Sequence, residues 1–543
     1  MIKVVSLDGK GDYTSIQAAI DAADEKERAP QIIVIRNGEY RERVVVNRRN
    51  LRIVGEDVNR TVITHSACAK DLGADGKEKG TFLSFTLLVA ADNVTLENLT
   101  VRNDAGDGRE VGQAVAVYAA GDRAVFRNCH LIAHQDTLFC GPLMPKVLNE
   151  IAPRTAEVQV VESVGDCPLT HARQYFENCH ITGDIDFIFG PYRCWFEKCL
   201  LRMNPRGGYY TAANTPEGQA YGFVFHDCLL AGDCAEGAAS LGRPWRKYAR
   251  TLFLNCAMEK CVSPQGFSDW GEDKPINPHL GEYASTDAAT DLPLDLSTRD
   301  PRQAILTDGQ ASAVTLRAVL GGYDDWRPDL PKPTWFICGD SIAATYAPDR
   351  APMTGWGQVL GNLTDEAFIE NCAMCGRSSK SFVAEGRLSI IELCLRRGDK
   401  LLISFSHNDK KPDRPRHTEP WSTFREYLNM YIDAARRNGA EPLMITPMPR
   451  RRFDENGQLV PTHLEYPDAM RALAAYRNVK CVDLESAMKA LLIDAGKDAS
   501  ARYYCHVPKG HENYPDGCED NTHLCFEGAV TLARIILDGL CRA

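Results

Sequence analysis

The sequence lacks a hydrophobic run that could cross a membrane, because no stretch approaches the roughly 20 apolar residues that a spanning helix needs. It also lacks a leader-like start. The apolar residues of MIKVVSLDGKGDY are interrupted by Lys3 and end at Asp8, whereas a secretory signal peptide has a longer apolar core. We therefore expect no membrane association and a cytoplasmic location, or an exported protein if a leader has been removed.

The sequence has no excess of positive charge either, since its formal net charge is −11. Proteins that bind nucleic acid normally present a basic surface, so this balance argues against a nucleic-acid partner. An acidic polymer would have to be met by local clusters of arginine and lysine, because the overall field repels it. At 543 residues the chain is too long for a single hydrophobic core, so two or more domains are expected.

Cysteine is abundant, with 20 residues, and five of them share the local pattern aromatic-x-polar-Cys-x-apolar. The five segments are FRNCHL at Cys129, FENCHI at Cys179, FEKCLL at Cys199, FHDCLL at Cys228 and FLNCAM at Cys256. A residue that recurs at one position of a repeat stacks on itself, and free cysteine behaves as a small buried hydrophobe. Because no export signal accompanies them, these cysteines predict a buried column rather than disulfides or a metal site.

The cysteine segments also indicate a repeat, since they follow one another at spacings of 50, 20, 29 and 28 residues. Short β-like pieces with such a period are typical of a solenoid, in which each coil buries its apolar face against its neighbours. We interpret residues 1–328 as a right-handed parallel β-helix. The segment TSIQAAIDAADE places apolar residues on one helical face after Thr14 and Ser15, and it is predicted to close one end of the solenoid.

A change of pattern marks the domain boundary. Residues 303–326 have helical periodicity, and the following RPDLPKP holds three prolines, which break regular structure. We place a linker at 329–333 and a second domain at 334–543. There the β-like segments TWFICGDS, KLLISFSHND and EPLMITPMP alternate with a helix that ends at Gly439. This alternation predicts an α/β domain, with three layers around a flavodoxin-like parallel sheet.

Four segments of the solenoid hold polar side chains that coil packing does not require: GQAVAV, HQDTLF, GDIDFIFG and LGRPW. In this order they resemble the pectin methylesterase (pectinesterase) family, as do the opening LDGKGDYTSIQAAIDAA, the phrase IRNGEYRERVVV and the closing VLGGYDDWRP. The resemblance covers nearly all of residues 1–328. It implies a β-helix enzyme that hydrolyses the methyl ester at C6 of galacturonate units in pectic oligosaccharides or polysaccharides.

The resemblance also implies roles for the charged residues. Asp186 would be the nucleophile, forming a covalent acyl intermediate. Asp136 would protonate the departing methanol and then activate water. This division of labour requires a raised pKa for Asp136 and an ionised Asp186, which Arg243 would hold in that state through a fork-shaped pairing.

The same resemblance assigns Gln113 and Gln135 as donors to the developing oxyanion and Trp245 as a stacking surface for a sugar. Two aspartates in a β-helix cleft could instead cleave glycosidic bonds, which is an alternative. If GDIDF is a strand, Asp184 lies on the opposite face from the nucleophile and is interpreted as structural. His134 is interpreted as a residue that lines the cleft or packs beside it.

An insertion over residues 144–173 follows the proposed acid, and the compact plant-type members of the family lack it. Long loops in compact domains are usually functional or disordered. We interpret this one as a wall at one end of the groove, which would favour short oligosaccharides over long polymer.

In the second domain, Ser341 follows a buried strand in ICGDSIAATY, and open α/β sheets bind ligands at the carboxyl ends of their strands. With NCAMCGRSSKSF, FSHND and EDNTHLCFEGA, this segment resembles the SGNH/GDSL hydrolases, most closely the rhamnogalacturonan acetylesterase family. The resemblance implies Ser341 as nucleophile, His523 as base and Asp520 as the residue that orients it, the last two on a single turn. The backbone N–H groups of Ser341 and Gly376 and the Asn408 amide would form the oxyanion hole.

Other residues of this domain have plainer interpretations. Ser406 stands where the family usually has Gly, so we predict that the backbone there needs no positive φ. His407 is interpreted as a neighbour of the oxyanion hole, and the C-x-x-C of Cys372 and Cys375 as packing rather than a redox pair. Four side chains near the C-terminus offer zinc-ligating atoms without a strong zinc spacing: His511, Cys518, Asp520 and His523.

The sequence therefore predicts a bifunctional enzyme that removes methyl esters and acetyl esters from pectic substrates, with no metal or organic cofactor in either mechanism. One alternative is a single acetylesterase whose β-helix only binds carbohydrate. Another keeps both sites but lets the second domain deacetylate xylan or a small glycoside.

Overall fold

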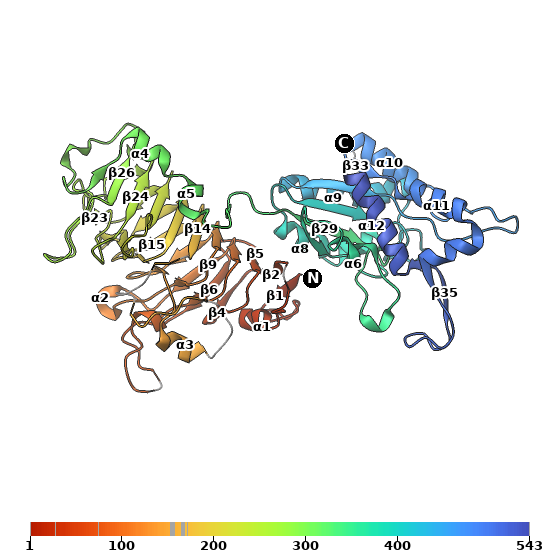
Figure 1. The fold of residues 1–543 in the computed structure, drawn as a ribbon, viewed down its shortest axis with the longest axis horizontal. Helices are drawn as coiled ribbons and strands as arrows, with labels where there is room; N and C mark the ends of the chain where they lie inside the picture. Colours follow the sequence, from red (N-terminus) through yellow and green to blue (C-terminus); the bar gives the residue numbers. More distant parts are fainter. Residues whose placement is uncertain are drawn as a thin grey trace. The chain divides into compact units, whose positions relative to one another are not determined.

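The structure is a computed structural model, and it describes residues 2–27, 29–73, 75–151, 158–163, 169–170 and 172–541. The chain divides into two compact units, one over Lys3–Pro331 and one that begins at Lys332 (Figure 1). This division falls within the predicted linker at 329–333. No helix among the described residues combines the length and apolarity needed to cross a bilayer.

The N-terminal unit is a parallel β-helix whose successive coils add strands to three parallel sheets (Figure 1). The largest sheet contains β1 (Lys3–Val5), β2 (Gln31–Ile35), β5 (Leu51–Gly55), β8 (Val94–Glu97), β11 (Ala124–Arg127), β14 (Arg173–Glu177), β17 (Arg193–Glu197), β21 (Phe223–His226), β24 (Thr251–Leu254), β26 (Leu280–Tyr283) and β28 (Ala304–Ile305). The second contains β3 (Gly38–Arg41), β6 (Thr61–His65), β9 (Thr100–Asn103), β12 (His130–Ile132), β15 (His180–Gly183), β18 (Leu200–Met203), β22 (Leu229–Gly232), β25 (Ala257–Met258) and β27 (Thr286–Asp287). The third, which carries the first site, contains β4 (Val44–Val46), β7 (Leu87–Val89), β10 (Val117–Ala119), β13 (Leu138–Cys140), β16 (Ile188–Gly190) and β20 (Thr211–Ala213). Together they confirm the predicted parallel β-helix.

The repeat pattern has a direct structural meaning. The polar residue before each repeated cysteine has a left-handed backbone, with φ between 49° and 53°, and turns the chain from the first sheet to the second: Asn128, Asn178, Lys198, Asp227 and Asn255. Asparagine and aspartate tolerate this conformation better than most residues do. The five cysteines that follow are buried and free, which confirms the predicted column.

The aromatic position of the repeat forms a ladder inside the solenoid. The rings of Phe126, Phe176, Phe196, Phe225 and Phe253 stack in that order, with centroids 4.8, 4.6, 4.4 and 4.6 Å apart. Burying a side chain of this size stabilises a fold by about 1.5–3 kcal/mol. The ladder therefore helps to keep neighbouring coils in register, and the register positions the site described below.

A short helix covers the N-terminal end of the solenoid. The predicted N-terminal helix is α1 (Ile16–Asp21), which Ser15 caps by accepting a hydrogen bond from the Ala18 backbone N–H. Ile16 and Ile20 of this helix belong to the solenoid core. Residues 303–326, predicted to be helical, form β28 followed by α4 (Asp308–Ala313) and α5 (Leu316–Leu320). Further short elements of this unit include α2 (Gly108–Val111) and the paired strands β19 (Gly208–Tyr209) and β23 (Ala239–Ser240).

The second unit is an α/β fold around a parallel sheet with the strand order β30-β29-β31-β32-β33, which is the flavodoxin-like order. These strands are β29 (Thr334–Gly339), β30 (Phe368–Asn371), β31 (Lys400–Ser404), β32 (Glu441–Ile445) and β33 (Lys480–Val482). The helices are α6 (Trp356–Leu360), α7 (Ser379–Ala384), α8 (Arg387–Cys394), α9 (Arg425–Arg437), α10 (Tyr466–Arg477), α11 (Leu484–Ala499) and α12 (Phe526–Cys541). An antiparallel pair, β34 (Tyr504–Val507) and β35 (Cys518–Leu524), precedes the last helix. The predicted α/β class is confirmed.

Candidate active sites

The two proposed catalytic aspartates of the β-helix occupy equivalent positions in neighbouring coils. Asp136 lies just before β13 and Asp186 just before β16, and these strands pair in parallel with Leu138 opposite Ile188. Both aspartates have a left-handed backbone, with φ of 65° and 51°. The Asp136 backbone N–H donates to the Ile185 carbonyl over 3.0 Å. The two turns are therefore fixed to each other by the same hydrogen-bond ladder that builds the solenoid.

Arg243 binds Asp186 through a two-pronged pairing. Its Nε lies 2.9 Å from Oδ1 and its Nη2 lies 2.7 Å from Oδ2 of that carboxylate. The guanidinium carbon also lies 4.0 Å from the ring centre of Tyr209 and 3.8 Å from that of Trp270. The Arg243 backbone N–H donates to the Thr211 carbonyl in β20 over 2.9 Å. The structure thus brings Arg243 to Asp186, within the aromatic cage of Tyr209 and Trp270.

Sequence reasoning did not identify Tyr209 or Trp270. Both lie outside the repeated cysteine segments, and an aromatic residue in an irregular segment gives no sign of which side chain it will contact. Tyr209 ends the short strand β19, which pairs with β23 just before Arg243. Only the stacking of the coils brings the two aromatic rings to the arginine.

The two carboxyls differ in their electrostatics. Burial raises the pKa of the Asp136 carboxyl well above its ordinary value, and the negative charge of Asp186 raises it further. Burial also raises the pKa of Asp186, but the hydrogen bonds and charge of Arg243 oppose that rise. We take Asp186 as the ionised member, because it alone receives the two charge-assisted hydrogen bonds. This asymmetry is the one that an acid and a nucleophile side by side require.

A cavity of about 220 Å³ opens over these residues. It is lined by the six residues proposed from the sequence: Gln113, Gln135, Asp136, Asp186, Arg243 and Trp245. Phe82, Phe189 and Trp270 line it as well. The cavity therefore combines two carboxyls, amide donors and apolar rings in one place, a combination suited to a sugar ester.

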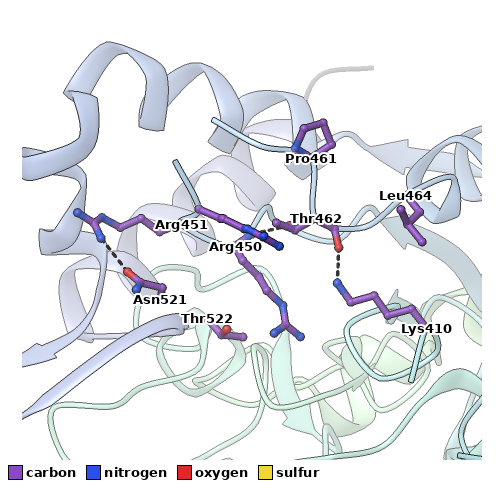
Figure 2. A pocket seen from close by; sticks show the side chains of 9 residues that line it. Lys410, Arg450, Arg451, Pro461, Thr462, Leu464, Asn521 and Thr522 are labelled. Carbon is purple, nitrogen blue, oxygen red and sulfur yellow. Dashed lines mark hydrogen bonds between the residues drawn. The ribbon is translucent and has the colours of Figure 1, made fainter. Parts of the chain in front are cut away.

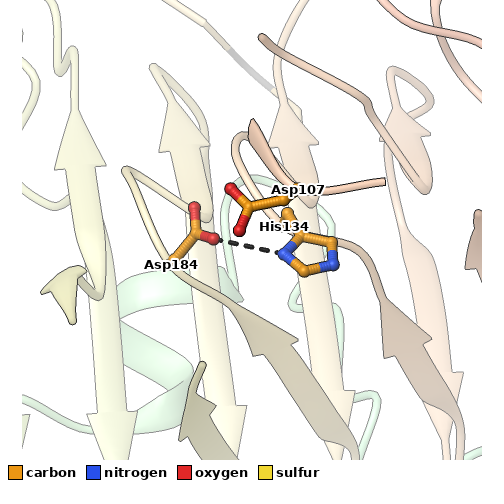
Figure 3. Close-up of side chains that lie close together, drawn as sticks. All are labelled: Asp107, His134 and Asp184. Atoms are coloured by element: carbon orange, nitrogen blue, oxygen red, sulfur yellow. Dashed lines mark hydrogen bonds and ion pairs between the residues drawn. The ribbon is translucent and has the colours of Figure 1, made fainter. Parts of the chain in front are cut away.

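A second polar cluster consists of Asp107, His134 and Asp184 (Figure 3). His134 Nδ1 is 3.3 Å from Asp184 Oδ2, and the fully buried Asp184 also accepts the Ile185 backbone N–H over 2.7 Å. The hydrogen bond to Asp184 raises the pKa of His134. Asp107 lies within reach of the pair, but its carboxylate is already bound by Arg109.

This cluster corrects one expectation and supports another. The segment that holds Asp184 and Asp186 is a bend before β16, not a strand, so the two side chains do not simply alternate between faces. Asp184 nevertheless has a structural role, because its carboxylate joins the bend to His134 in the preceding coil. Neither Asp184 nor His134 is among the residues that line the cavity.

The insertion at 144–173 begins with α3 (Pro145–Ile151). Its residues outside the described part of the chain are 152–157, 164–168 and 171. Lys146 donates to the backbone carbonyls of Glu78 and Lys79, both over 2.8 Å. Among the described residues of the insertion, none lines the cavity. The predicted wall of the groove therefore stays a prediction, since part of it falls outside the described residues.

The second unit brings together a serine, a histidine and an aspartate. Ser341 Oγ lies 3.0 Å from His523 Nε2, and His523 Nδ1 lies 2.6 Å from Asp520 Oδ2. Asp520 Oδ1 accepts the backbone N–H groups of Thr522 and His523 over 2.7 and 2.9 Å. Burial alone would raise the pKa of the Asp520 carboxyl, but these hydrogen bonds lower it to about 2. The predicted single turn is wrong, because both residues lie in strand β35.

The proposed oxyanion donors lie on separate loops. Ser341 lies two residues after the end of β29, separated from the strand by Asp340. Asn408 is buried, and its Nδ2 donates to the Arg377 carbonyl over 3.0 Å, which leaves its second N–H for a substrate. Gly376 has φ of +79°, a conformation that favours glycine.

Ser406 contradicts the prediction that its backbone needs no positive φ. Its φ is +139°, a value that residues other than glycine rarely adopt. The residue is fully buried, and its hydroxyl lies 3.2 Å from His463 Nδ1. A residue with such an unusual backbone conformation costs about 1–3 kcal/mol of stability. The buried polar contact of its hydroxyl offsets part of that cost. His407 next to it is buried with its ring 4.2 Å from that of His463.

Comparison with known families adds independent evidence. A family model described as pectinesterase matches residues 2–142 and 160–316, which together are more than half of the chain. The unmatched stretch between them, residues 143–159, overlaps the first half of the insertion. A model described as GDSL-like lipase/acylhydrolase family matches residues 337–523, which include the whole Ser-His-Asp set.

Individual relatives agree with these matches. Rhamnogalacturonan acetylesterase RhgT of Bacillus subtilis (strain 168) is 46% identical over 207 residues, which are 38% of this chain and 88% of that protein. Pectinesterase 2 of Citrus sinensis is 29% identical over 336 residues, which are 60% of this chain and 58% of that protein. A probable pectinesterase/pectinesterase inhibitor of Arabidopsis thaliana, number 23, is 31% identical over 284 residues, 50% of this chain and 44% of that protein. This chain thus spans only about half the length of these two plant relatives.

Among solved structures, pectin methylesterase PemA from Erwinia chrysanthemi has 29% identity and a TM-score of 0.49, covering 61% of this chain and 98% of that one. A pectin methylesterase in complex with a hexasaccharide has the same identity, TM-score and coverage. The two family models and the acetylesterase relative show that the chain belongs to two families of carboxylic ester hydrolases, the pectinesterases through its β-helix and the GDSL hydrolases related to rhamnogalacturonan acetylesterase through its α/β unit.

Proposed function

We propose that the chain is a bifunctional pectin-deesterifying enzyme. The β-helix would remove methyl esters from galacturonate units, and the α/β unit would remove acetyl esters from pectic or rhamnogalacturonan oligosaccharides. The observation that carries the proposal is that each unit has a complete set of reacting groups of its own: Asp186 with Asp136 and Arg243, and Ser341 with His523. The relatives' names, pectinesterase and rhamnogalacturonan acetylesterase, support the two substrate classes.

In the β-helix, an Asp186 oxygen attacks the C6 carbonyl carbon of a methyl-esterified galacturonate. Gln113 and Gln135 donate hydrogen bonds to the oxygen that becomes negative. Asp136 gives its proton to the departing methanol, and an anhydride between Asp186 and the sugar acid remains. Asp136, now ionised, removes a proton from water, which attacks the anhydride and releases galacturonate and a free Asp186 carboxylate.

In the α/β unit, Ser341 Oγ attacks the acetyl carbonyl carbon while His523 Nε2 takes the hydroxyl proton. His523 then gives that proton to the departing sugar oxygen, and acetyl-Ser341 remains. Water repeats the sequence with His523 as base, releasing acetate. Asp520 holds the imidazole and stabilises its charged form, and Gly376 and Asn408 support the oxyanion.

Product analysis tests the proposal. The whole chain is incubated with a pectic oligosaccharide that carries both methyl and acetyl esters, and methanol and acetate are measured separately. We expect both products. Acetate alone would mean that the β-helix only binds carbohydrate, and acetate from acetylated xylan but not from the pectic substrate would reassign the α/β unit. Release of neither product would contradict both halves of the proposal.

A further inference from the structure

The α/β unit has a cavity of about 530 Å³ whose lining is rich in positive charge (Figure 2). Lys410, Arg450, Arg451 and Arg452 all contribute to it, and we call this cavity the basic pocket. No acidic side chain lines it among the described residues. In a chain with a net charge of −11, four cations around one cavity form a marked local reversal of charge.

No carboxylate of the described residues pairs with a cation of the basic pocket. Several other arginines of this unit form ion pairs, as Arg471 does with Asp468 and Asp483. In the described part of the chain, none of the four forms an ion pair. Lys410 donates to the Thr462 carbonyl and Arg451 to Asn521 Oδ1, both neutral acceptors (Figure 2). The Arg450 Nε is buried without a hydrogen-bond partner.

The positive charge of the basic pocket, together with burial, lowers the pKa values of neighbouring groups. Burial, with the charges of Arg450 and Lys411, lowers the pKa of Lys410 to about 8. Burial, with the charges of Lys410 and Arg450, lowers the pKa of His463 to about 3. Both shifts disfavour further positive charge, as expected beside cations that lack a counter-ion. A bound anion would relieve this repulsion.

The lining of the basic pocket includes sequence neighbours of the residues proposed for the Ser-His-Asp site. Thr522, which precedes His523, lines the pocket, and Lys410 follows two residues after Asn408 in the proposed oxyanion loop. Burial raises the pKa of Asp340, the residue before Ser341, and Arg450 is among the charges that oppose this rise. An anionic group in the pocket would therefore belong to the same substrate molecule whose acetyl ester Ser341 attacks.

We propose that the basic pocket binds the free carboxylate of a galacturonate unit at or next to the acetylated sugar, so that the acetylesterase acts best after the methyl ester has been removed. The inference rests on the proposed function. A methyl ester is neutral, whereas its hydrolysis product is a carboxylate that arginine can bind through charge-assisted hydrogen bonds. The product of the β-helix would thus be the preferred substrate of the α/β unit, which sets the order of the two reactions.

The test compares two acetylated galacturonate oligosaccharides that differ only in whether the carboxyl groups are free or methyl-esterified. The full chain carrying Asp186→Asn is used, so that methyl esters persist during the assay. We expect kcat/KM for acetate release to be about 10-fold or more higher on the free acid, the effect of one hydrogen-bonded charge. Free galacturonate should inhibit acetate release more strongly than its methyl ester does.

Variants of the pocket locate the preference. Arg450→Gln and, separately, Lys410→Gln in the same background should reduce the ratio of the two kcat/KM values toward one, chiefly by raising KM for the free acid. Arg534→Gln, which removes an exposed charge from α12 of the same unit, should keep the wild-type ratio. Melting temperatures of all variants show whether a lost preference reflects a lost fold.

Three outcomes are distinguishable. Equal rates on the two substrates, or an unchanged ratio in both folded pocket variants, would overturn the carboxylate subsite while leaving the bifunctional proposal intact. No acetate from either substrate would contradict the proposed function itself. A preference for the free acid that both pocket variants abolish, and Arg534→Gln retains, supports the inference.

Discussion

The two units position their reacting groups by different uses of the backbone. In the β-helix, Asp136 and Asp186 are 50 residues apart and occupy equivalent turns of neighbouring coils. In the α/β unit, Ser341 and His523 are 182 residues apart and come from a strand end and a separate hairpin. The first site is therefore part of a repeating scaffold, whereas the second is assembled from the end of a sheet strand and a hairpin far from it in the sequence.

The difference extends to electrostatics. The β-helix places two carboxyls together in a buried cavity, so that burial and Arg243 decide which one carries the proton. The α/β unit instead builds a polar chain, in which hydrogen bonds keep Asp520 ionised. Protonation is shared within a coupled pair in one case and fixed in the other. Changes that test this contrast should affect only one product.

The largest expected effect is a loss of acetate release when the hydrogen bond between Asp520 and His523 is altered. Asp520→Asn should lower kcat for acetate release by about 10⁴-fold, because the histidine loses the partner that sets its tautomer and stabilises its charge. Methanol release should stay at the wild-type rate. Rates of both products on one substrate check this, and a loss of methanol release as well would show that the sites are not independent.

Removing one oxyanion donor should lower kcat by a similar factor in the two units, although their scaffolds differ. Gln135→Ala should lower kcat for methanol release by about 10²–10³-fold, the usual effect of removing one such donor. Asn408→Ala should have an effect of the same order on acetate release. Steady-state kinetics of both variants measure this, and an effect confined to KM would assign the altered side chain to substrate binding instead.

The coupled carboxyls predict a bell-shaped pH profile for methanol release. Activity should fall at low pH as Asp186 is protonated and at high pH as Asp136, whose pKa is raised, loses its proton. Arg243→Lys removes the fork that opposes the rise in the pKa of Asp186. The low-pH limb should therefore move to higher pH, and kcat should fall by about 10- to 100-fold.

A pH titration of both products separates the causes. The acetate profile of Arg243→Lys serves as the control, since this residue lies in the other unit. If the low-pH limb of methanol release stays in place, Arg243 does not control the ionisation of Asp186.

The smallest expected effect concerns backbone strain at Ser406. Ser406→Gly should raise the free energy of unfolding of the α/β unit by about 1 kcal/mol or less, because relief of the strained φ exceeds the loss of the hydroxyl contact with His463. Ser406→Ala is the matched control, since it loses that contact and keeps the strain, and it should destabilise. Denaturant unfolding followed by fluorescence measures both, and equal destabilisation would contradict strain at this residue.

Much of this architecture could be predicted from the sequence, because repeats and motifs are local patterns. The aromatic and cysteine positions of each coil predicted the solenoid, and the proposed catalytic residues of both units came from short segments that resemble known families. What it could not predict depends on contacts across coils or loops. Trp270 beside Arg243 and the pairing of His134 with Asp184 are examples, since nothing near these residues in the sequence names their partners.

Two corrections have the same origin. The bend that holds Asp184 and Asp186 is set by hydrogen bonds to the preceding coil, which a strand pattern does not reveal. The unusual φ of Ser406 follows from its buried place next to His463, whereas residue preference alone indicates an ordinary backbone.

The most direct test of two independent sites on one chain is a crossed comparison on a single doubly esterified pectic oligosaccharide. Asp186→Asn and Ser341→Ala are assayed side by side for methanol and acetate. The account predicts that Asp186→Asn abolishes methanol release and still releases acetate, and that Ser341→Ala does the reverse. Loss of both products in either folded variant would contradict it.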